Sequence, residues 1–151
     1  MEGATNFRPC SQKTEEVFRQ RDISPTAIRL LVARAMYEFE HAFTLANLED
    51  KLDTVDKSTL SRTINLFHAK HLIHSIDDGS GSIKYSVCSD NCMCEIADLH
   101  PHFFCTKCRQ TTCMDNSHIP QVELPENYHL SSVNFVLKGV CAQCSKGNSS
   151  E

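Results

Sequence analysis

Two pairs of cysteines in the second half of the chain have the spacing of metal ligands. Cys105 and Cys108 form one Cys-x-x-Cys pair, and Cys141 and Cys144 form the other. Each such loop points two thiolates to one side, with sulfur atoms about 2.3 Å from a tetrahedral zinc ion, so two loops fill all four coordination positions. We therefore predict a closed, structural zinc site. A thioredoxin-like role is disfavoured, because neither pair opens a helix after a strand in a βαβ unit.

The expected cellular compartment also favours metal over disulfides. The chain has nine cysteines among 151 residues, which is an odd number. The first twenty residues show no apolar core of a signal peptide, and no run approaches the roughly 20 apolar residues that span a bilayer. We expect a cytoplasmic protein with no membrane partner, in which thiols stay reduced unless a metal holds them.

A second group of possible ligands surrounds the first cysteine pair. Cys88, Cys92, Cys94, Glu95, His100 and His102 precede it, and Cys113 follows it. His74 lies in a run expected to pair with the strand that ends near Cys88, so it can reach the same place. Each residue alone also fits a packing role, with the thiols as small apolar side chains. As a set, they predict a second metal centre.

These ligands need elements to position them, and the first half of the chain has the pattern of helices followed by a hairpin. Apolar residues recur at helical spacing after Ser24 and Pro25, which fit the cap and first position of a helix. Thr44 fits the cap of a shorter helix, and Asp56 or Ser58 that of a third. Two alternating runs, LIHSI and SIKYSV, flank DDGSG and predict a hairpin. This order predicts a winged helix-turn-helix.

The third helix carries the residue types of a DNA-reading surface. No acidic residue occurs from Lys57 to Ile76. Leu60, Ile64 and Phe67 share one face, which leaves hydroxyl, amide and basic side chains on the other, where they can reach base edges in a major groove. A solvated helix face is the competing interpretation. The place of the helix before a wing favours DNA, and the candidate residues are Lys57, Ser58, Thr59, Ser61, Arg62 and Asn65.

The distribution of cysteines suggests a domain boundary, and the absence of known catalytic motifs argues against an enzyme. Only Cys10 precedes Cys88, and this shift in cysteine content places a domain boundary between Cys88 and Asp98. The net charge of −4 gives no overall basic bias. The chain lacks the His-Glu-x-x-His, deaminase and nucleophile-elbow motifs, so we predict that it is not an enzyme. A zinc-stabilised protein-interaction module is an alternative, which would keep the cysteines but not need the third helix.

Together these motifs resemble the ferric uptake regulator (Fur) family of bacterial metal-dependent repressors. The resemblance rests on DKSTLSRTINLF, LIHSIDDGSGSIKYSVC, HPHFFCTKC and GVCAQC, and it covers about residues 13–144. It implies a homodimer on operator DNA, with an α+β fold. The expected division is a winged helix-turn-helix in residues 1–88, a hinge in residues 89–98 and a small α/β dimerisation domain with the four-cysteine zinc site in residues 99–151.

The resemblance also assigns roles to single residues. In the recognition helix, Thr59 and Arg62 match the family's usual Ala-Thr-Val-Tyr-Arg, whereas Ser61 replaces the tyrosine that contacts DNA. We therefore expect a different operator preference. The family's structural zinc ligands correspond to Cys105, Cys108, Cys141 and Cys144.

For the regulatory site, the resemblance favours zinc. The zinc-responsive branch has ligands that match His74, Cys88 and His100 or His102, with Cys113 where that branch has a glutamate. Thiolate ligands suit zinc better than ferrous iron or manganese. We thus predict a zinc-responsive repressor of metal-homeostasis genes.

An iron- or peroxide-sensing regulator is the alternative within the family. It would use His41 with His100, His102 and Glu95, and its metal would be Fe²⁺ or Mn²⁺. A third family site is expected to be absent, because Pro101 and Val133 stand where two of its ligands would be.

Overall fold

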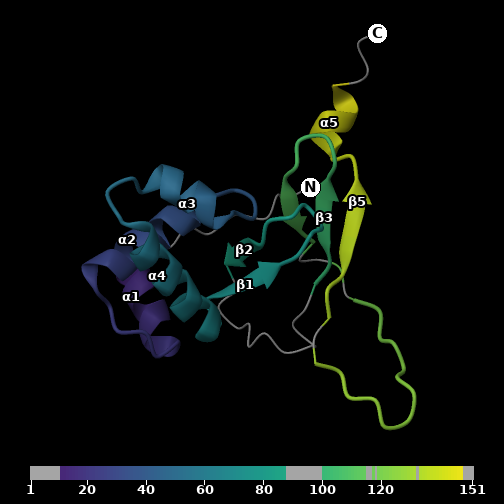
Figure 1. Cartoon of the computed structure of the whole chain (residues 1–151), viewed down its shortest axis with the longest axis horizontal. Coiled ribbons are helices and arrows are strands. Elements are labelled where there is room, and N and C mark those ends of the chain that lie inside the picture. The colour runs from purple at the N-terminus through teal and green to yellow at the C-terminus, as the bar shows by residue number, and fades with distance from the viewer. Residues whose placement is uncertain (1–10, 88–99, 115–116, 118, 132, 148–151) are drawn as a thin grey trace.

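The computed structural model describes residues 11–87, 100–114, 117, 119–131 and 133–147. The first four helices gather at one end of the molecule, a three-stranded sheet and the short last helix form the other, and a hairpin lies between them (Figure 1). The elements in chain order are α1 (Ser11–Gln20), α2 (Ala27–Tyr37), α3 (Leu45–Lys51), α4 (Lys57–Ala69), β1 (Ile73–Ile76), β2 (Lys84–Val87), β3 (His102–Cys105), β4 (Thr111–Cys113), β5 (Val136–Gly139) and α5 (Ala142–Lys146).

The main hydrophobic core lies among α1 to α4 and the hairpin. Leu60, Ile64 and Phe67 of α4 are buried in it, as the helical pattern predicted. Helix α1 was not predicted from the sequence, yet its Phe18 is fully buried. The rings of Phe18 and Phe67 lie with their centroids 5.5 Å apart. Helix α1 therefore packs against α4, the candidate DNA-binding helix, and completes the core on that side.

Side-chain caps define where three of the helices begin. Thr44 caps α3 through a reciprocal pair of hydrogen bonds with Asn47, as predicted, and Asp56, one of the two residues predicted for α4, caps that helix. The prediction of Ser24 as cap of α2 was wrong. Thr26 is the cap, because its extended backbone places its hydroxyl to accept from the amide of Arg29 at 3.3 Å. Ser24 contributes its carbonyl oxygen instead, which accepts from the Arg29 guanidinium at 2.9 Å.

The hairpin has the predicted antiparallel pairing. Ile73 pairs with Val87 at the open end, and Ile76 pairs with Lys84 next to the turn. The turn contains Gly79 and Gly81 at φ 78° and 93°, a left-handed region that favours glycine. Backbone hydrogen bonds between Phe43 and Tyr85, at 2.7 and 2.9 Å, attach the segment before α3 to β2. The hairpin is therefore fixed to the helical part along one edge.

The C-terminal sheet has the order β4-β3-β5, with β3 antiparallel to β4 and parallel to β5. Strand β5, which precedes the second cysteine pair, lies parallel to β3, which ends in the first pair, so the two pairs meet at the same end of the sheet. Parallel strands need a crossover, and its described part, which projects from the sheet, contains no helix (Figure 1). Four large apolar side chains on it are exposed: Val122, Leu124, Tyr128 and Leu130.

The predicted domain boundary and the predicted hinge are not tested by the structure. Residues 88–99, where the domain boundary and the hinge were predicted, lie outside the described residues. Among the helices of the described residues, none has the length and apolar character needed to cross a membrane.

Candidate metal centres and nucleic-acid interface

The four cysteines of the two Cys-x-x-Cys pairs meet at one end of the C-terminal sheet. Cys105 ends β3, Cys108 lies in the following turn, and Cys141 and Cys144 lie at the cap and inside α5. Their sulfur atoms all lie within 4.8 Å of one another. The sulfur atoms of Cys108 and Cys141 are 3.9 Å apart, close to the roughly 3.8 Å edge of a tetrahedron with bonds of about 2.3 Å. The geometry fits the predicted tetrahedral zinc site.

Backbone hydrogen bonds shape this four-cysteine site. The turn after β3 closes through the amide of Arg109, which donates to the Cys105 carbonyl at 2.9 Å with Arg109 at φ 66°. The amide of Cys141 donates to the Cys105 sulfur at 3.4 Å. This contact and further amides lower the pKa of Cys105 to about 6. The neighbouring thiols raise the pKa of Cys144 to about 12, first through a hydrogen bond with Cys141. Thiolates this close together repel one another, so a second cysteine resists losing its proton. A divalent cation bound among the sulfur atoms offsets this repulsion.

A second group of ligands, here called the histidine group, consists of His74, His100, His102 and Cys113. Their candidate ligand atoms all lie within 4.8 Å of one another. His74 comes from β1, His102 and Cys113 are register partners on β3 and β4, and His100 precedes β3. The Nε2 atoms of His74 and His102 are 3.2 Å apart. The hairpin and the C-terminal sheet therefore both contribute to this group.

The surroundings of the histidine group keep the imidazole of His74 available as a ligand. Burial, followed by the nearby His102, His100 and His68, lowers the pKa of His74 to about 3. A neutral imidazole offers a lone pair to a metal, whereas an imidazolium does not. The sulfur of Cys113 lies 3.2 Å from the hydroxyl of Ser86 on β2. Three imidazoles and one thiol form a donor set that fits a borderline metal such as zinc.

The remaining predicted ligands stand apart from these two groups or outside the described residues. Cys88, Cys92, Cys94 and Glu95 lie in the undescribed segment. His41 belongs to neither ligand group that the described residues form. Its Nδ1 atom lies 3.5 Å from the hydroxyl of Thr112, whose neighbour in β4 is Cys113.

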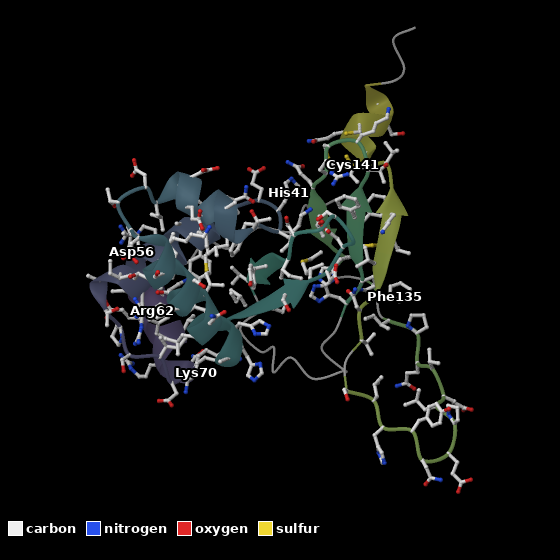
Figure 2. All side chains as sticks on the ribbon, viewed as in Figure 1. His41, Asp56, Arg62, Lys70, Phe135 and Cys141 are labelled. Carbon is white, nitrogen blue, oxygen red and sulfur yellow. The ribbon has the colours of Figure 1, made fainter. Side chains whose placement is uncertain are left out.

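Helix α4 presents most of the predicted DNA-binding residues to solvent. Lys57, Ser58, Arg62 and Asn65 are exposed, and Ser61 is half-buried. Thr59 is committed in part to the helix cap, since its hydroxyl donates to the Asp56 carboxylate at 2.6 Å. Arg62 lies on the helical part of the molecule, well away from Cys141 (Figure 2).

Two charged groups at the start of α4 bear on this surface. Hydrogen bonds from Thr59 hold the pKa of Asp56 below its ordinary value. The ammonium of Lys57 lies 3.6 Å from the Glu49 carboxylate. Among the charged candidates, Arg62 has the guanidinium that can bind a base edge or a phosphate with two parallel hydrogen bonds.

A buried polar cluster lies between the hairpin and the C-terminal sheet, and it was not predicted from the sequence. Lys84 of β2 makes an ion pair of 2.7 Å with Asp78 in the hairpin turn, and both contact Thr111 of β4. The only sequence signal was a lysine at an inward position of an alternating strand. The acceptors from the sheet come 25 or more residues later, so no local pattern marks them.

Solved structures with the same fold include metal-dependent regulators. One is a zinc uptake regulator complexed with zinc and DNA, which has a TM-score of 0.68 and 16% identity over 92% of this chain and 95% of that chain. A zinc-bound manganese uptake regulator has a TM-score of 0.57 and 20% identity over 84% and 97%. The ferric uptake regulator of Helicobacter pylori has a TM-score of 0.55 and 13% identity over 89% and 90%. At these identities the likeness concerns the fold, and it confirms the predicted α+β arrangement.

The sequence itself gives the family. No curated protein matches the chain. The sequence model described as "Ferric uptake regulator family" matches residues 25–138, which is more than half of the 151 residues. Members of that family are dimeric DNA-binding regulators that respond to metal, in agreement with the predicted partners, operator DNA and a second copy of the chain. The resemblance seen in the sequence is thus confirmed, and the chain belongs to the ferric uptake regulator family of transcription regulators.

Proposed function

We propose that the protein is a zinc-responsive repressor that controls genes of metal homeostasis. The observation that carries this proposal is the histidine group, because its ligands come from two parts of the molecule. His74 belongs to the hairpin, and Cys113 belongs to the C-terminal sheet. A metal ion held by both restricts how the hairpin sits on the sheet. The four-cysteine site has the separate role of a permanent structural zinc site.

Helix α4 is the proposed reader of the operator. Its exposed Lys57, Ser58, Arg62 and Asn65, together with Thr59 and Ser61, supply phosphate and base contacts. In a dimer, two such helices meet successive major grooves when they are roughly 34 Å apart. A metal that favours this spacing raises DNA affinity, and DNA by reciprocity tightens metal binding. Coupling of this kind is typically about 1 to 3 kcal/mol, a 5- to 150-fold response.

Zinc is the proposed signal because of the donor set. A site with a thiolate and several imidazoles suits zinc, whereas ferrous iron and manganese are better served by carboxylate and imidazole. Cys88, outside the described residues, is proposed as a further ligand, since it follows β2 directly. Sensing of ferrous iron, manganese or peroxide is the competing function and would enlist His41 and Glu95.

A metal titration tests the proposal. Operator DNA is first captured from a genomic library, and zinc, ferrous iron and manganese are then titrated into protein already loaded at the four-cysteine site. We expect zinc to raise DNA affinity by about 5- to 150-fold. His102→Ala and Cys113→Ser should abolish this response while keeping the structural zinc and the dimer. His129→Ala, an exposed histidine on the crossover, is the matched control and should respond as the parent does.

Three outcomes would change the proposal. Equal DNA affinity with the histidine group empty and filled would remove the sensor mechanism. A response to iron or manganese alone would reassign the signal to the competing function. Failure to capture any DNA sequence would favour a zinc-stabilised protein-interaction module.

A further inference from the structure

An ion pair is buried where the hairpin meets the C-terminal sheet. The ammonium of Lys84 lies 2.7 Å from the carboxylate of Asp78, and the exposed fractions of the two side chains are 9% and 0%. Taking two such charges out of water costs several kcal/mol per ion, and the cost is offset only when the remaining hydrogen-bonding positions are filled. The partners that fill them therefore show what the pair holds together.

Those partners come from the turn between β3 and β4 and from β4 itself. Lys84 Nζ donates to the carbonyl of Arg109 at 2.7 Å and to the hydroxyl of Thr111 at 3.0 Å. With Asp78, these acceptors account for all three hydrogens of the ammonium. The hydroxyl of Thr111 in turn donates to Asp78 Oδ2 at 2.6 Å. The ammonium also lies 4.7 Å from the centre of the Phe104 ring. We call Asp78, Lys84, Thr111 and the Arg109 carbonyl the Lys84 cluster.

The Lys84 cluster is directly connected to the four-cysteine site. Arg109 follows Cys108, and its amide closes the turn by donating to the carbonyl of Cys105. The carbonyl that Lys84 binds thus belongs to the turn that carries the first cysteine pair. A second contact supports the same docking, because the side-chain amide nitrogen of Asn134 donates to the backbone carbonyl of Asp77 in the hairpin turn at 2.8 Å.

Strand β2 therefore meets β4 at two polar points. One is the contact of Lys84 with Thr111, which needs no regulatory metal. The other is the contact of Ser86 with Cys113, which lies inside the histidine group. Two such contacts on one strand fix the direction of the hairpin on the sheet more firmly than one does.

We propose that Lys84 and Asp78 are positioning residues that dock the hairpin onto the turn of the four-cysteine site, so that metal at the histidine group can set the direction of the DNA-binding part. This inference rests on the proposed function, since it explains how metal binding reaches α4. Without the Lys84 cluster, the histidine group still binds metal, and the hydrogen bond from Asn134 to Asp77 and the backbone bond from Ala42 to Thr111 remain, but the metal-bound hairpin is held less firmly on the sheet. DNA affinity of the metal-loaded protein then falls more than that of the protein without regulatory metal.

The test compares DNA affinities with and without regulatory zinc. The double variant Asp78→Asn/Lys84→Met removes both charges and leaves no unpaired ion, so its fold should be retained. We expect the ratio of the two affinities to fall by about 2- to 30-fold, the range over which single positions change coupling. Thr111→Val, which keeps the ion pair, should lower the ratio less and serves as a second variant if the double variant fails to fold. Glu38→Gln/Lys51→Met removes another ion pair, of 2.8 Å, within the helical part and should leave the ratio unchanged.

The measurements separate positioning from stability. Melting temperature, zinc content and metal affinity without DNA are recorded for each variant, and a purely structural role would change the first of these but not the ratio. An unchanged or larger ratio in the double variant and in Thr111→Val would overturn the inference. Absence of any zinc response in the parent protein would instead overturn the proposed function, so the two failures are distinguishable.

Discussion

At the scale of single residues, burial shifts the pKa values of two hairpin side chains in opposite directions: it lowers that of His74 and by itself would raise that of Asp78. His74 is driven to the neutral form, because burial and neighbouring histidines lower its pKa to about 3. Burial alone would raise the pKa of Asp78, but hydrogen bonds from Lys84, Ser80 and Thr111 outweigh it and hold that pKa well below its ordinary value of 3.8. The neutral imidazole of His74 is thereby available to a cation, whereas the Asp78 carboxylate is charged at neutral pH.

The sequence indicated a functional role for His74 but not for Asp78. His74, His100, His102 and Cys113 were all among the candidate ligands, because histidine and cysteine close to a metal-binding loop are informative residue types. Asp78 was read only as part of a turn. Its importance depends on contacts with a lysine beyond the turn and a threonine 33 residues away, which only the folded chain brings together.

Asp78 leads to a prediction about pH. Asp78→Asn should lower the free energy of unfolding at neutral pH by about 3 to 5 kcal/mol, because Lys84 is left as an uncompensated buried charge. The folded pKa of Asp78 is depressed, so its stabilising contribution is complete above the ordinary pKa and is lost as pH falls below about 4. Urea unfolding of both proteins from neutral pH to about pH 3 should show the gap shrinking. A gap of constant size would contradict the charged state of Asp78.

At the scale of elements, helices were predictable where caps and apolar spacing are local. Thr44 was predicted as the cap of α3, and Asp56 was one of two candidates for α4; each accepts a hydrogen bond from the backbone amide three residues later. Helix α1 was missed because few apolar residues mark it, and the partner that buries its Phe18 is Phe67, far along the chain. The short α5 was missed for a similar reason, since it offers no buried residue.

Helix α4 gives a prediction for DNA binding. Arg62→Ala should weaken operator binding by about 1 to 3 kcal/mol if the guanidinium contacts a base, without changing metal content. If it contacts a phosphate instead, affinity should fall equally for all sequences and the salt dependence should become less steep. Lys146→Ala removes the same charge from exposed α5 and is the control. Unchanged affinity of Arg62→Ala across several salt concentrations would remove Arg62 from the reading surface.

At the scale of the whole molecule, the hairpin is held on both sides. Phe43 and Tyr85 attach it to the helical part, and the Lys84 cluster attaches it to the C-terminal sheet. The order of helices, hairpin and final sheet followed from the sequence pattern. The parallel pairing of β3 with β5 was harder to foresee, because it depends on a crossover that has no periodic pattern. The division into residues 1–88, 89–98 and 99–151 stays a prediction.

The four-cysteine site gives a prediction for the assembled protein. Cys105→Ser removes one of four ligands from a site that contributes on the order of 10 kcal/mol in small zinc domains. We expect loss of the structural zinc, of the dimer and of DNA binding together, measured by metal analysis, sedimentation and DNA titration. Cys113→Ser is the matched control and should keep the zinc and the dimer. A Cys105→Ser protein that stays dimeric and melts like the parent would refute the structural role of the site.

The crossover between β4 and β5 has a consequence for how the chain folds. Its residues 120–131 are exposed, so little local packing offsets the entropy of bringing β5 back to β3. Contacts of such long sequence separation form slowly. Until they form, one edge of β3 is open, and an open edge is a template for pairing with other chains. Zinc bound by Cys105, Cys108, Cys141 and Cys144 would close that loop, so we expect less of the chain to aggregate when zinc is supplied during folding.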